Sequence, residues 1–354
     1  MVRMKANLSF LESAVDARIG GIGVLDVTVV ICAYTLDRWE LTKAAVESSR
    51  TQSHPPHSVV LCIDNNSELL ARAKKEWAGA SNPSVVVIPN ESTNHLAGRD
   101  AHVSAHGELR RFGAGTARNT GLRHVNTEVV AFLDDDARAE FDWLAMLTAA
   151  YTPGVVAVGG SPQPDFAIPR PPWFPYCFDW IFGCTYYGMP TTLMPYTRLI
   201  GANMSVHTEE LRSLGGFSGS DFDDLDICTR LEDKFGRGTI LYQPNAVVHH
   251  HVPANRLQLK YLLRRSYFVN REKVRVHQRL SSRRPLAPEV GFLLTLASYL
   301  KHELGRLVRG DLWAVARVGV ALTGTVLAAL GNFVGQYRYK LRPTGLSSGP
   351  RIDQ

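Results

Sequence analysis

The chain has 354 residues, enough for one large α/β domain with an appendage or for two domains. With 45% hydrophobic and 20% charged residues, its composition is that of an ordinary globular protein and excludes a largely disordered chain. The five cysteines include no Cys-x-x-Cys pair, so they indicate neither a zinc site nor a disulfide framework and favour a reducing compartment. Because the apolar run near the N-terminus is short and interrupted, we expect no signal peptide.

The net charge of +6 has its main source between positions 256 and 284. This segment carries ten basic residues and a single acidic residue, Glu272. Because apolar stretches follow it, the segment favours an anionic membrane surface over nucleic acid as its partner. The ten basic residues are Arg256, Lys260, Arg264, Arg265, Arg271, Lys273, Arg275, Arg279, Arg283 and Arg284.

The first part of the chain predicts strands that alternate with helices. Apolar runs rich in β-branched residues predict strands at 27–32, 59–63 and 85–88, and helical patterns fill 36–50 and 67–80. Strands joined in this way by short crossover helices pair in parallel. The segment therefore predicts part of a parallel α/β sheet.

The middle of the chain predicts short strands around an irregular insertion. Further strands are expected at 155–158, 198–205 and 239–242, after a polar loop over 90–114. Between them, residues 162–195 combine many prolines with many aromatic side chains. These aromatics either line a substrate cleft or form a small core beneath a long loop, and the sequence leaves both alternatives open.

Two apolar segments, at 290–300 and 312–331, follow the basic segment. The second is about 20 residues long, is interrupted only by Arg317, and could cross a hydrocarbon core of about 30 Å. Its many Ala, Gly and Thr residues equally suit a helix at the membrane interface, and a buried helix of a soluble protein is the third alternative.

Three consecutive carboxylates, Asp134, Asp135 and Asp136, end the apolar run at 129–133. They need a counter-charge, because each loses hydration beside a buried strand and repels the next. In an extended chain residues i and i+2 face one side, so Asp134 and Asp136 can bind one divalent metal while Asp135 points away. Crevices beyond the carboxyl ends of strands are the usual ligand sites of α/β sheets. The alternative is a solvated acidic turn.

Several further motifs accompany the carboxylates in a fixed order. Together they resemble the family 2 glycosyltransferases, whose GT-A fold is a Rossmann-like, mostly parallel mixed sheet flanked by helices. The resemblance extends over about 27–263, and the chain beyond it is predicted to be a basic and apolar helical extension. The matching stretches are 29–34, 63–67, 117–122, 132–136, 201–205, 215–217 and 223–231.

The resemblance implies a nucleotide-sugar site at the ends of the first strands. Asp64 would accept a hydrogen bond from the uracil ring NH, while Ala33 and Tyr34 would line the base pocket. Arg118 would pair with the diphosphate, because a planar cationic fork suits phosphate oxygens. Asp134 and Asp135 would also contact the donor.

The resemblance further implies a bound Mg²⁺ or Mn²⁺ ion that bridges the diphosphate. Asp136, with Asp134, would hold this ion. His250, the central residue of the triplet 249–251, aligns with a family histidine and would complete the metal site. A purely structural histidine is the alternative.

Asp224 would be the general base that deprotonates the acceptor hydroxyl, so that the sugar is transferred with inversion. The acceptor would be bound by Asn203, Asp223, Asp226 and Arg230. The family usually has Glu in place of Asp223, which leaves open which of the two neighbouring acids is the base.

The expected domains are an N-terminal arm over 1–25, a GT-A catalytic domain over 26–253 and a helical membrane-associating region over 254–354. Within the catalytic domain, residues 26–136 would bind the nucleotide-sugar and residues 137–253 the acceptor.

The expected function is inverting transfer of a sugar from a nucleotide-diphospho-sugar, with a UDP-sugar as the expected donor, to a hydroxyl group of a cell-envelope glycan or lipid-linked saccharide. The enzyme would act at the cytoplasmic face of the plasma membrane, held by one or two C-terminal helices. Three alternatives are a phosphatase-type hydrolase, a nucleotidyltransferase and a non-catalytic membrane scaffold. Ala137 replaces the Thr or Val usual in the phosphatases, and a nucleotidyltransferase would need a Gly-rich loop after the first strand.

Overall fold

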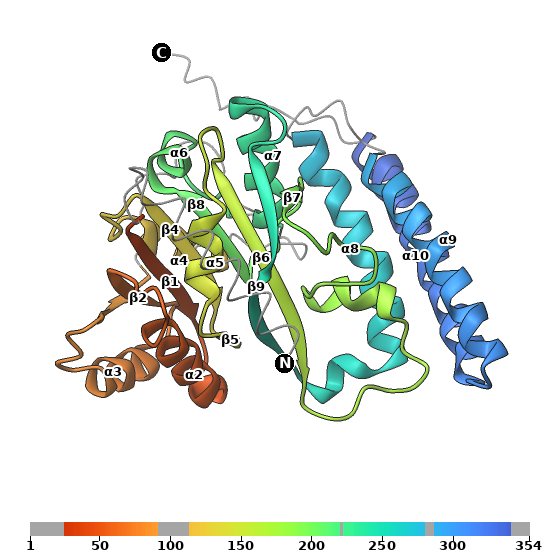
Figure 1. Cartoon of the computed structure of the whole chain (residues 1–354), viewed down its shortest axis with the longest axis horizontal. Helices are drawn as coiled ribbons and strands as arrows, with labels where there is room; N and C mark the ends of the chain where they lie inside the picture. The colour runs from red at the N-terminus through yellow and green to blue at the C-terminus, as the bar shows by residue number, and fades with distance from the viewer. Residues whose placement is uncertain (1–24, 91–112, 220–221, 280–286, 341–354) are drawn as a thin grey trace, which may run out of the picture. The chain divides into compact units, whose positions relative to one another are not determined.

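A computed structural model describes residues 25–90, 113–219, 222–279 and 287–340 (Figure 1). The chain forms two compact units. The sheet unit comprises residues 1–163 and 190–250, and the helical unit comprises residues 164–189 and 251–354. The expected N-terminal arm and polar loop lie largely outside the described residues, as do the side chains of Arg275, Arg279, Arg283 and Arg284.

Four parallel strands form one half of the sheet in the order β3-β2-β1-β4. Because each strand is followed by a helix before the next begins, the strands enter the sheet in the same direction, as the sequence predicts. The strands are β1 (Val27–Ala33), β2 (Ser58–Ile63), β3 (Ser84–Pro89) and β4 (Val129–Asp134), and the intervening helices are α2 (Trp39–Arg50), α3 (Ser67–Glu76) and α4 (Ala114–Leu122).

The other half of the sheet begins where β8 pairs antiparallel with β4, and the order continues through β6 and β9 to β5. The result is a mixed sheet flanked by helices, which confirms the predicted fold class. Strands β6 and β9 run well beyond 158 and 242, the ends predicted from the sequence. The strands are β5 (Ala137–Ala139), β6 (Ala157–Phe166), β7 (Met194–Pro195), which pairs with β9, β8 (Asn203–His207) and β9 (Ile240–Val252).

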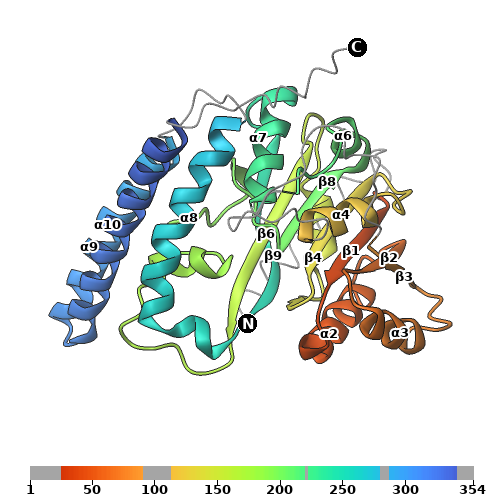
Figure 2. The ribbon, with the colours of Figure 1, turned by 180° about the vertical axis from the view of Figure 1, so that it is seen from behind.

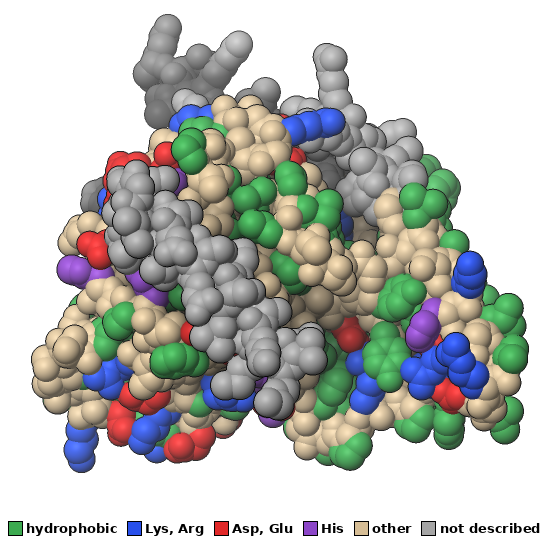
Figure 3. Space-filling model, in the orientation of Figure 1, with side chains coloured by type: hydrophobic (Ala, Val, Ile, Leu, Met, Phe, Trp, Pro, Cys, Tyr) green, Lys and Arg blue, Asp and Glu red, His purple; other side chains and the backbone are tan. Residues whose placement is uncertain are grey.

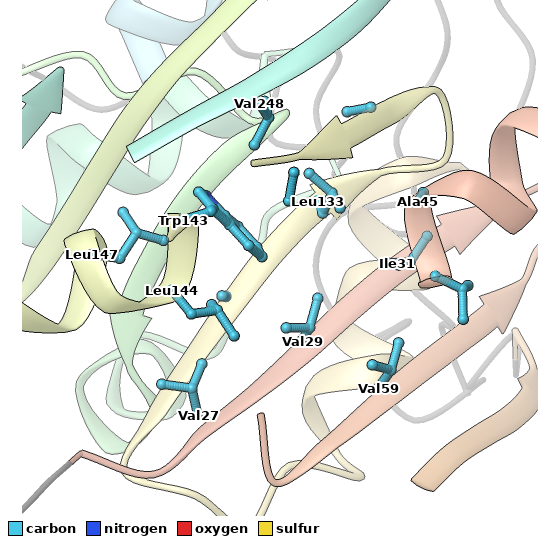
Figure 4. Packing of buried hydrophobic residues seen from close by; sticks show 14 of the residues in the cluster. Val27, Val29, Ile31, Ala45, Val59, Leu133, Trp143, Leu144, Leu147 and Val248 are labelled. Carbon is cyan, nitrogen blue, oxygen red and sulfur yellow. The ribbon is translucent and has the colours of Figure 1, made fainter. Parts of the chain in front are cut away.

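Alternating side chains give the sheet two buried faces. On one face Val29, Val59 and Leu133 pack with Trp143 and Leu144 of α5 (Trp143–Ala149), as Figure 4 shows. The same face is covered by α2 and α3, and the opposite face by α4, α6 (Thr208–Ser213) and α7 (Asp223–Phe235). A sheet covered on both faces leaves its carboxyl edge as the place where polar groups of several strands can meet.

The helical unit is built on three long helices that follow two short 3-10 turns, and α8 and α10 lie side by side in both views (Figures 1 and 2). Its core contains Phe174, Phe178 and Phe182 from the aromatic insertion, all buried. These three side chains therefore form a core rather than line a cleft. The elements are η3 (Tyr176–Phe182), η4 (Ala254–Leu257), α8 (Leu259–Arg279), α9 (Ala287–Val308) and α10 (Trp313–Lys340).

Arg317, which interrupts the longer apolar segment, is buried in α10 and paired with acids. Its Nε donates to Glu303 at 2.8 Å and its NH2 to Asp311 at 2.7 Å, while NH1 donates to the carbonyl oxygen of Pro172 at 2.9 Å. Arg306 also pairs with Asp311, at 2.8 Å. Arginine is suited to such a cluster because its five N–H groups can bond several partners at once.

Candidate active site

The carboxyl ends of β1, β2 and β4 lie side by side at one edge of the sheet. Cys32 pairs in register with Asp134, and Ala33 pairs with Ile63, so the residues that follow these strands are neighbours. Tyr34 is about half exposed there, and the backbone N–H of Asp64 donates to the carbonyl oxygen of Ala33 at 2.8 Å. The sequence motifs at 29–34, 63–67 and 132–136 are thus brought together.

Asp134, Asp136 and His250 form a group whose ligand atoms all lie within 4.8 Å of one another. His250 Nε2 lies 3.1 Å from Asp136 Oδ1, and both side chains are buried. Asp134, in contrast, is 35% exposed in its side chain. His250 reaches the carboxylates because β9 pairs with β5, which begins directly after Asp136, and places His250 opposite Ala137. The structure therefore brings together the three residues that sequence analysis expected to hold a metal.

Asp135 is not a member of this group and pairs with an arginine that sequence analysis did not identify. Arg38 NH1 donates to Asp135 Oδ1 at 3.1 Å and also lies 2.9 Å from Asp136 Oδ2. Burial, and after it the charge of Asp136, raise the pKa of Asp135 to about 7 against the opposing effect of Arg38. The acidic motif thus draws part of its counter-charge from the chain itself, through η1 (Leu36–Arg38).

Arg118 supplies the second counter-charge. Its NH2 donates to Asp134 Oδ1 at 3.0 Å and to the carbonyl oxygen of Gly201 at 3.3 Å. Burial would lower the pKa of Arg118, but the carboxylates of Asp134, Asp223 and Asp224 raise it, so the guanidinium stays charged. The pairing of Arg118 with a diphosphate remains a prediction.

The next residue, Asn119, joins two of the sequence motifs. Its amide accepts from the backbone N–H of Phe217 and donates to its carbonyl oxygen, both at 2.8 Å. Gly216 has φ +75°, and a Cβ there would meet the Asn119 side chain at 2.3 Å. This position therefore needs glycine for both its backbone conformation and its close approach.

Asn90, at the end of β3, is a second residue that sequence analysis missed. Its Nδ2 donates to Asp64 Oδ1 at 2.7 Å and to Thr116 Oγ1 at 3.2 Å, while its Oδ1 accepts from Thr120 Oγ1 at 2.7 Å. Asn90 thereby fixes Asp64 against α4. Its place two residues after the strand predicted at 85–88 is the signal that could have found it.

Two neighbouring acids at the start of α7 have different surroundings. Asp223 is buried, and its carboxylate occupies the space in front of Gly115, where a Cβ would come within 2.0 Å of Oδ2. Asp224 is half-buried, and its Oδ1 accepts from the backbone N–H of Leu225 at 2.8 Å. Asp224 is therefore the more accessible of the two.

Three of the residues expected to bind the acceptor, Asn203, Asp226 and Arg230, have hydrogen-bond partners within the chain. Asn203 is fully buried, accepts from Trp143 Nε1 at 2.8 Å and donates to the carbonyl oxygen of Ala246 at 2.9 Å, so its amide is used within the core. Arg230 donates to Asp226 at 2.8 Å and to two carbonyl oxygens of the glycine turn before α7. The contacts of Asn203 stabilise the core between β8, α5 and β9, and those of Arg230 stabilise the start of α7.

The chemistry of the group formed by Asp134, Asp136 and His250 fits a divalent cation. Carboxylate oxygens and a neutral imidazole are ordinary ligands of such ions. Oxygen ligands lie about 2.0–2.1 Å from Mg²⁺, so ligands on opposite sides are about 4 Å apart. A separation of at most 4.8 Å between the ligand atoms is compatible with that geometry.

The chain is similar to known glycosyltransferases. A family model described as Glycosyl transferase family 2 matches residues 106–211. The glucosyl-dolichyl phosphate glucuronosyltransferase of Haloferax volcanii is 27% identical over 260 residues, which cover 70% of this chain and 76% of the relative. The pre-mycofactocin glycosyltransferase of Mycobacterium tuberculosis is 26% identical over 243 residues, which cover 64% of this chain and 49% of that relative.

Among solved structures, a mannosyltransferase from Pyrobaculum calidifontis, in complex with GDP-Man and Mn²⁺, matches with a TM-score of 0.53. The sequences are 18% identical, and the match covers 94% of this chain and 96% of that chain. At this level of identity the likeness shows a common fold.

Proposed function

This chain belongs to glycosyltransferase family 2, and we propose that it transfers a sugar from a UDP-sugar to a hydroxyl group of a glycan or lipid-linked saccharide, with inversion at the anomeric carbon. The observation that carries the proposal is the convergence of Asp134, Asp136, His250 and Arg118 beyond the carboxyl end of β4. Family membership removes the phosphatase, nucleotidyltransferase and scaffold alternatives.

The donor would bind along the carboxyl edge of the parallel strands. Asp64, held by Asn90, would accept from the uracil NH, and the exposed ring of Tyr34 would cover the base beside Ala33. Arg118 would direct its guanidinium to the diphosphate oxygens, for which its fork geometry is suited.

Asp134, Asp136 and His250 would hold Mg²⁺ or Mn²⁺. A bound ion would neutralise the negative charge that develops on the diphosphate as it leaves. Arg38 would keep Asp136 in place from its other side, since it contacts Oδ2 while His250 contacts Oδ1. The Pyrobaculum mannosyltransferase was solved in complex with Mn²⁺, which supports a divalent ion of this kind.

Asp224 would be the general base. Its carboxylate would take the proton of the acceptor hydroxyl while the hydroxyl oxygen attacks C1 of the sugar. The bond from C1 to the diphosphate would break on the opposite face, which inverts the anomeric centre. A general base needs to come within about 3 Å of this hydroxyl, and Asp224 is more accessible than the buried Asp223.

A lipid-linked acceptor is supported by the haloarchaeal relative, whose name specifies a glucosyl-dolichyl phosphate. The basic residues of α8 and the apolar α10 would hold the enzyme at an anionic membrane surface, in contact with such an acceptor. Together with the free cysteines, this favours the cytoplasmic face of the plasma membrane.

The test is turnover of a panel of nucleotide-sugars by the wild type, by Asp224→Asn and by Asp233→Asn, an exposed control on the same helix. We expect nucleoside diphosphate release from one UDP-sugar with Mn²⁺ or Mg²⁺, at least a 100-fold loss of kcat in Asp224→Asn, and no loss in the control. Retained turnover in Asp224→Asn would refute the assigned base, and turnover of none of the sugars would refute the donor class.

A further inference from the structure

The two faces of α10 have the opposite character from those of a soluble amphipathic helix. The face packed inside the unit consists of small residues and one paired arginine: Ala314, Arg317, Ala321, Gly324, Gly331 and Gly335. Most of the large apolar side chains are exposed on the outside, while Val320 is partly buried against the core of the unit. A helix of a soluble protein places its large apolar side chains toward the core, whereas small residues at helix contacts are typical of helices in lipid.

The outward face forms a continuous apolar stripe, which we call the outer stripe. Its residues recur at helical spacing, are between 44% and 67% exposed, and have no charged residue among them. The outer stripe consists of Val315, Leu322, Val326, Leu330, Phe333 and Tyr337. Figure 3 shows hydrophobic side chains on the surface over α9 and α10. In water such a surface is unfavourable, so it requires an occupant.

The helix cannot turn the outer stripe inward, because its inner face contacts the backbone of α8. A Cβ on Gly331 would lie 2.2 Å from the carbonyl oxygen of Tyr267, and one on Gly335 would lie 2.6 Å from that of Arg271. Larger side chains cannot be accommodated on this face without separating the helices. The outward direction of the stripe is therefore fixed by the packing of α8 and α10.

The charges around the stripe identify an anionic bilayer as the occupant. Exposed Lys301 and Arg309 lie on α9 and the turn after it, and exposed Arg338 lies beside the far end of the stripe. Trp313 and Tyr337, both exposed, stand near the two ends of the apolar stretch. Aromatic and basic residues around an apolar helix face are typical of the lipid headgroup region.

The same helices indicate that α10 lies along the surface rather than across the bilayer. α10 packs on α8, which exposes Lys260, Arg264 and Arg265. If α10 crossed the bilayer, α8 would enter it too, and each of these charges would cost about 2.5–3.5 kcal/mol at its centre. In the plane of the interface, the same charges can contact the phosphate groups of the lipids.

We propose that α10 lies in the plane of an anionic membrane, with the outer stripe immersed between headgroups and acyl chains and with α8 held above it. This inference deepens the proposed function, because it specifies how the enzyme would reach a lipid-linked acceptor. It also assigns the long apolar segment to the interface rather than to a transmembrane span.

Vesicle flotation tests whether the outer stripe binds an anionic membrane. The full chain is expected to float with vesicles of phosphatidylcholine and phosphatidylglycerol, and less with phosphatidylcholine alone. In Leu322→Glu/Val326→Glu the bound fraction should fall about tenfold or more, because two immersed side chains are lost from the contact. Ala71→Glu/Lys75→Gln on α3, which changes the net charge equally at exposed positions, should bind like the wild type.

Spin labels test the orientation. Single labels at Val315→Cys, Val326→Cys and Tyr337→Cys follow the stripe, and the unsubstituted chain, with its buried or half-buried cysteines, gives the background signal. In vesicles the three labels should lie at equal, shallow depth. A maximum depth at Val326 would show that α10 crosses the bilayer and would overturn the proposal.

Two further results would also overturn it. One is a failure of the wild type to bind vesicles of either composition. The other is a dimer that the Leu322→Glu/Val326→Glu change dissociates in lipid-free buffer, because the occupant would then be a second copy. Turnover of a UDP-sugar, measured on the same samples in detergent, separates these results from a failure of the proposed function.

Discussion

The two units of the chain each contain a cluster of acids paired with arginines, and the clusters differ in their balance of charge. In the helical unit Glu303 and Asp311 meet Arg306 and Arg317, so two negative charges face two positive ones. Glu303 is fully buried and Arg317 is 3% exposed. Asp311 and Arg306 are 26% and 35% exposed in their side chains, so this cluster is balanced in charge but is not closed to water.

In the sheet unit, the balance is incomplete. Three carboxylates, at 134–136, pair with two arginines among the described residues, Arg38 and Arg118, so the acids outnumber the arginines that pair with them. The group is also open to water through Asp134. An excess of acids over the cations that pair with them, rather than burial or access to solvent, therefore distinguishes the candidate binding site from the structural ion cluster.

Removal of one partner of the balanced cluster has the largest expected effect. Arg317→Met should lower the free energy of unfolding by about 3–5 kcal/mol, because Glu303 is then buried without its cation. Urea unfolding measures the loss, and kcat per folded molecule should stay unchanged. Arg317→Met/Glu303→Gln should recover much of the stability. If the double variant is no more stable than the single one, the cluster does not act as a balanced pair.

In the sheet unit, removal of one acid should lower activity and leave stability unchanged, the opposite of the result expected for Arg317→Met. Asp136→Asn should lower kcat/KM at least about 100-fold, because a carboxylate ligand is lost. Its free energy of unfolding without added metal should not fall, since the substitution also removes a repulsion between neighbouring carboxylates. Turnover and thermal unfolding with and without Mn²⁺ measure both effects. Wild-type stabilisation by Mn²⁺ in this variant would exclude Asp136 as a ligand.

A second buried pair in the helical unit, Arg170 and Asp179, predicts that the stability of the protein depends on pH. Both guanidinium NH groups of Arg170 bond Asp179, yet burial raises the pKa of Asp179 to about 6. Because this folded-state pKa lies above the ordinary value near 3.8, stability from this group is present below about pH 4 and is lost as the pH rises to 6.

The loss should be about 1–3 kcal/mol, read as the difference between the pH profiles of unfolding for the wild type and Asp179→Asn. Asp165→Asn, which changes an acid outside this pair, serves as the control. Identical profiles for the wild type and Asp179→Asn would contradict the raised pKa.

The smallest effect is expected from a change beside the donor site. Asn90→Ala removes the hydrogen bond to Asp64 Oδ1, so KM for the donor should rise about fivefold to tenfold with little change in kcat. Thr116→Val leaves the bond from Asn90 to Asp64 in place and loses the weaker 3.2 Å contact with Asn90 and a 2.9 Å bond to the carbonyl oxygen of Gly113, so it should have a smaller effect. An equal loss in both variants would indicate a general disturbance of α4.

The parallel half of the sheet could be predicted from sequence because its strands are short, apolar and separated by helices. The ends of β6 and β9 could not. Polar residues such as Gln163 and Asp165 in β6, or Gln243 and Asn245 in β9, break the apolar pattern, although pairing with neighbouring strands continues through them. Backbone hydrogen bonds of a sheet do not depend on side-chain character, so strand ends carry a weak sequence signal.

Within the candidate site, sequence identified the groups that stand in recognisable motifs and missed those that depend on the fold alone. Asp134, Asp136 and His250 come from two motifs far apart in the chain. Arg38 could have been sought by asking which cation balances Asp135, but only the fold shows that η1 lies beside the acids. The burial of Asn203 depends likewise on packing against Trp143.

The histidine triplet of β9 also bears on how the chain finds its register. Three identical side chains in succession give no information about which should face Asp136, and slipping the strand by one residue would still present an imidazole. The choice is made by Ala246 and Val248, which share the face of His250 and would leave the core after such a slip. The burial of Ala246 and Val248 thus fixes the register of β9. Hydrophobic packing, rather than metal binding, thereby places His250 opposite Ala137 and beside Asp136.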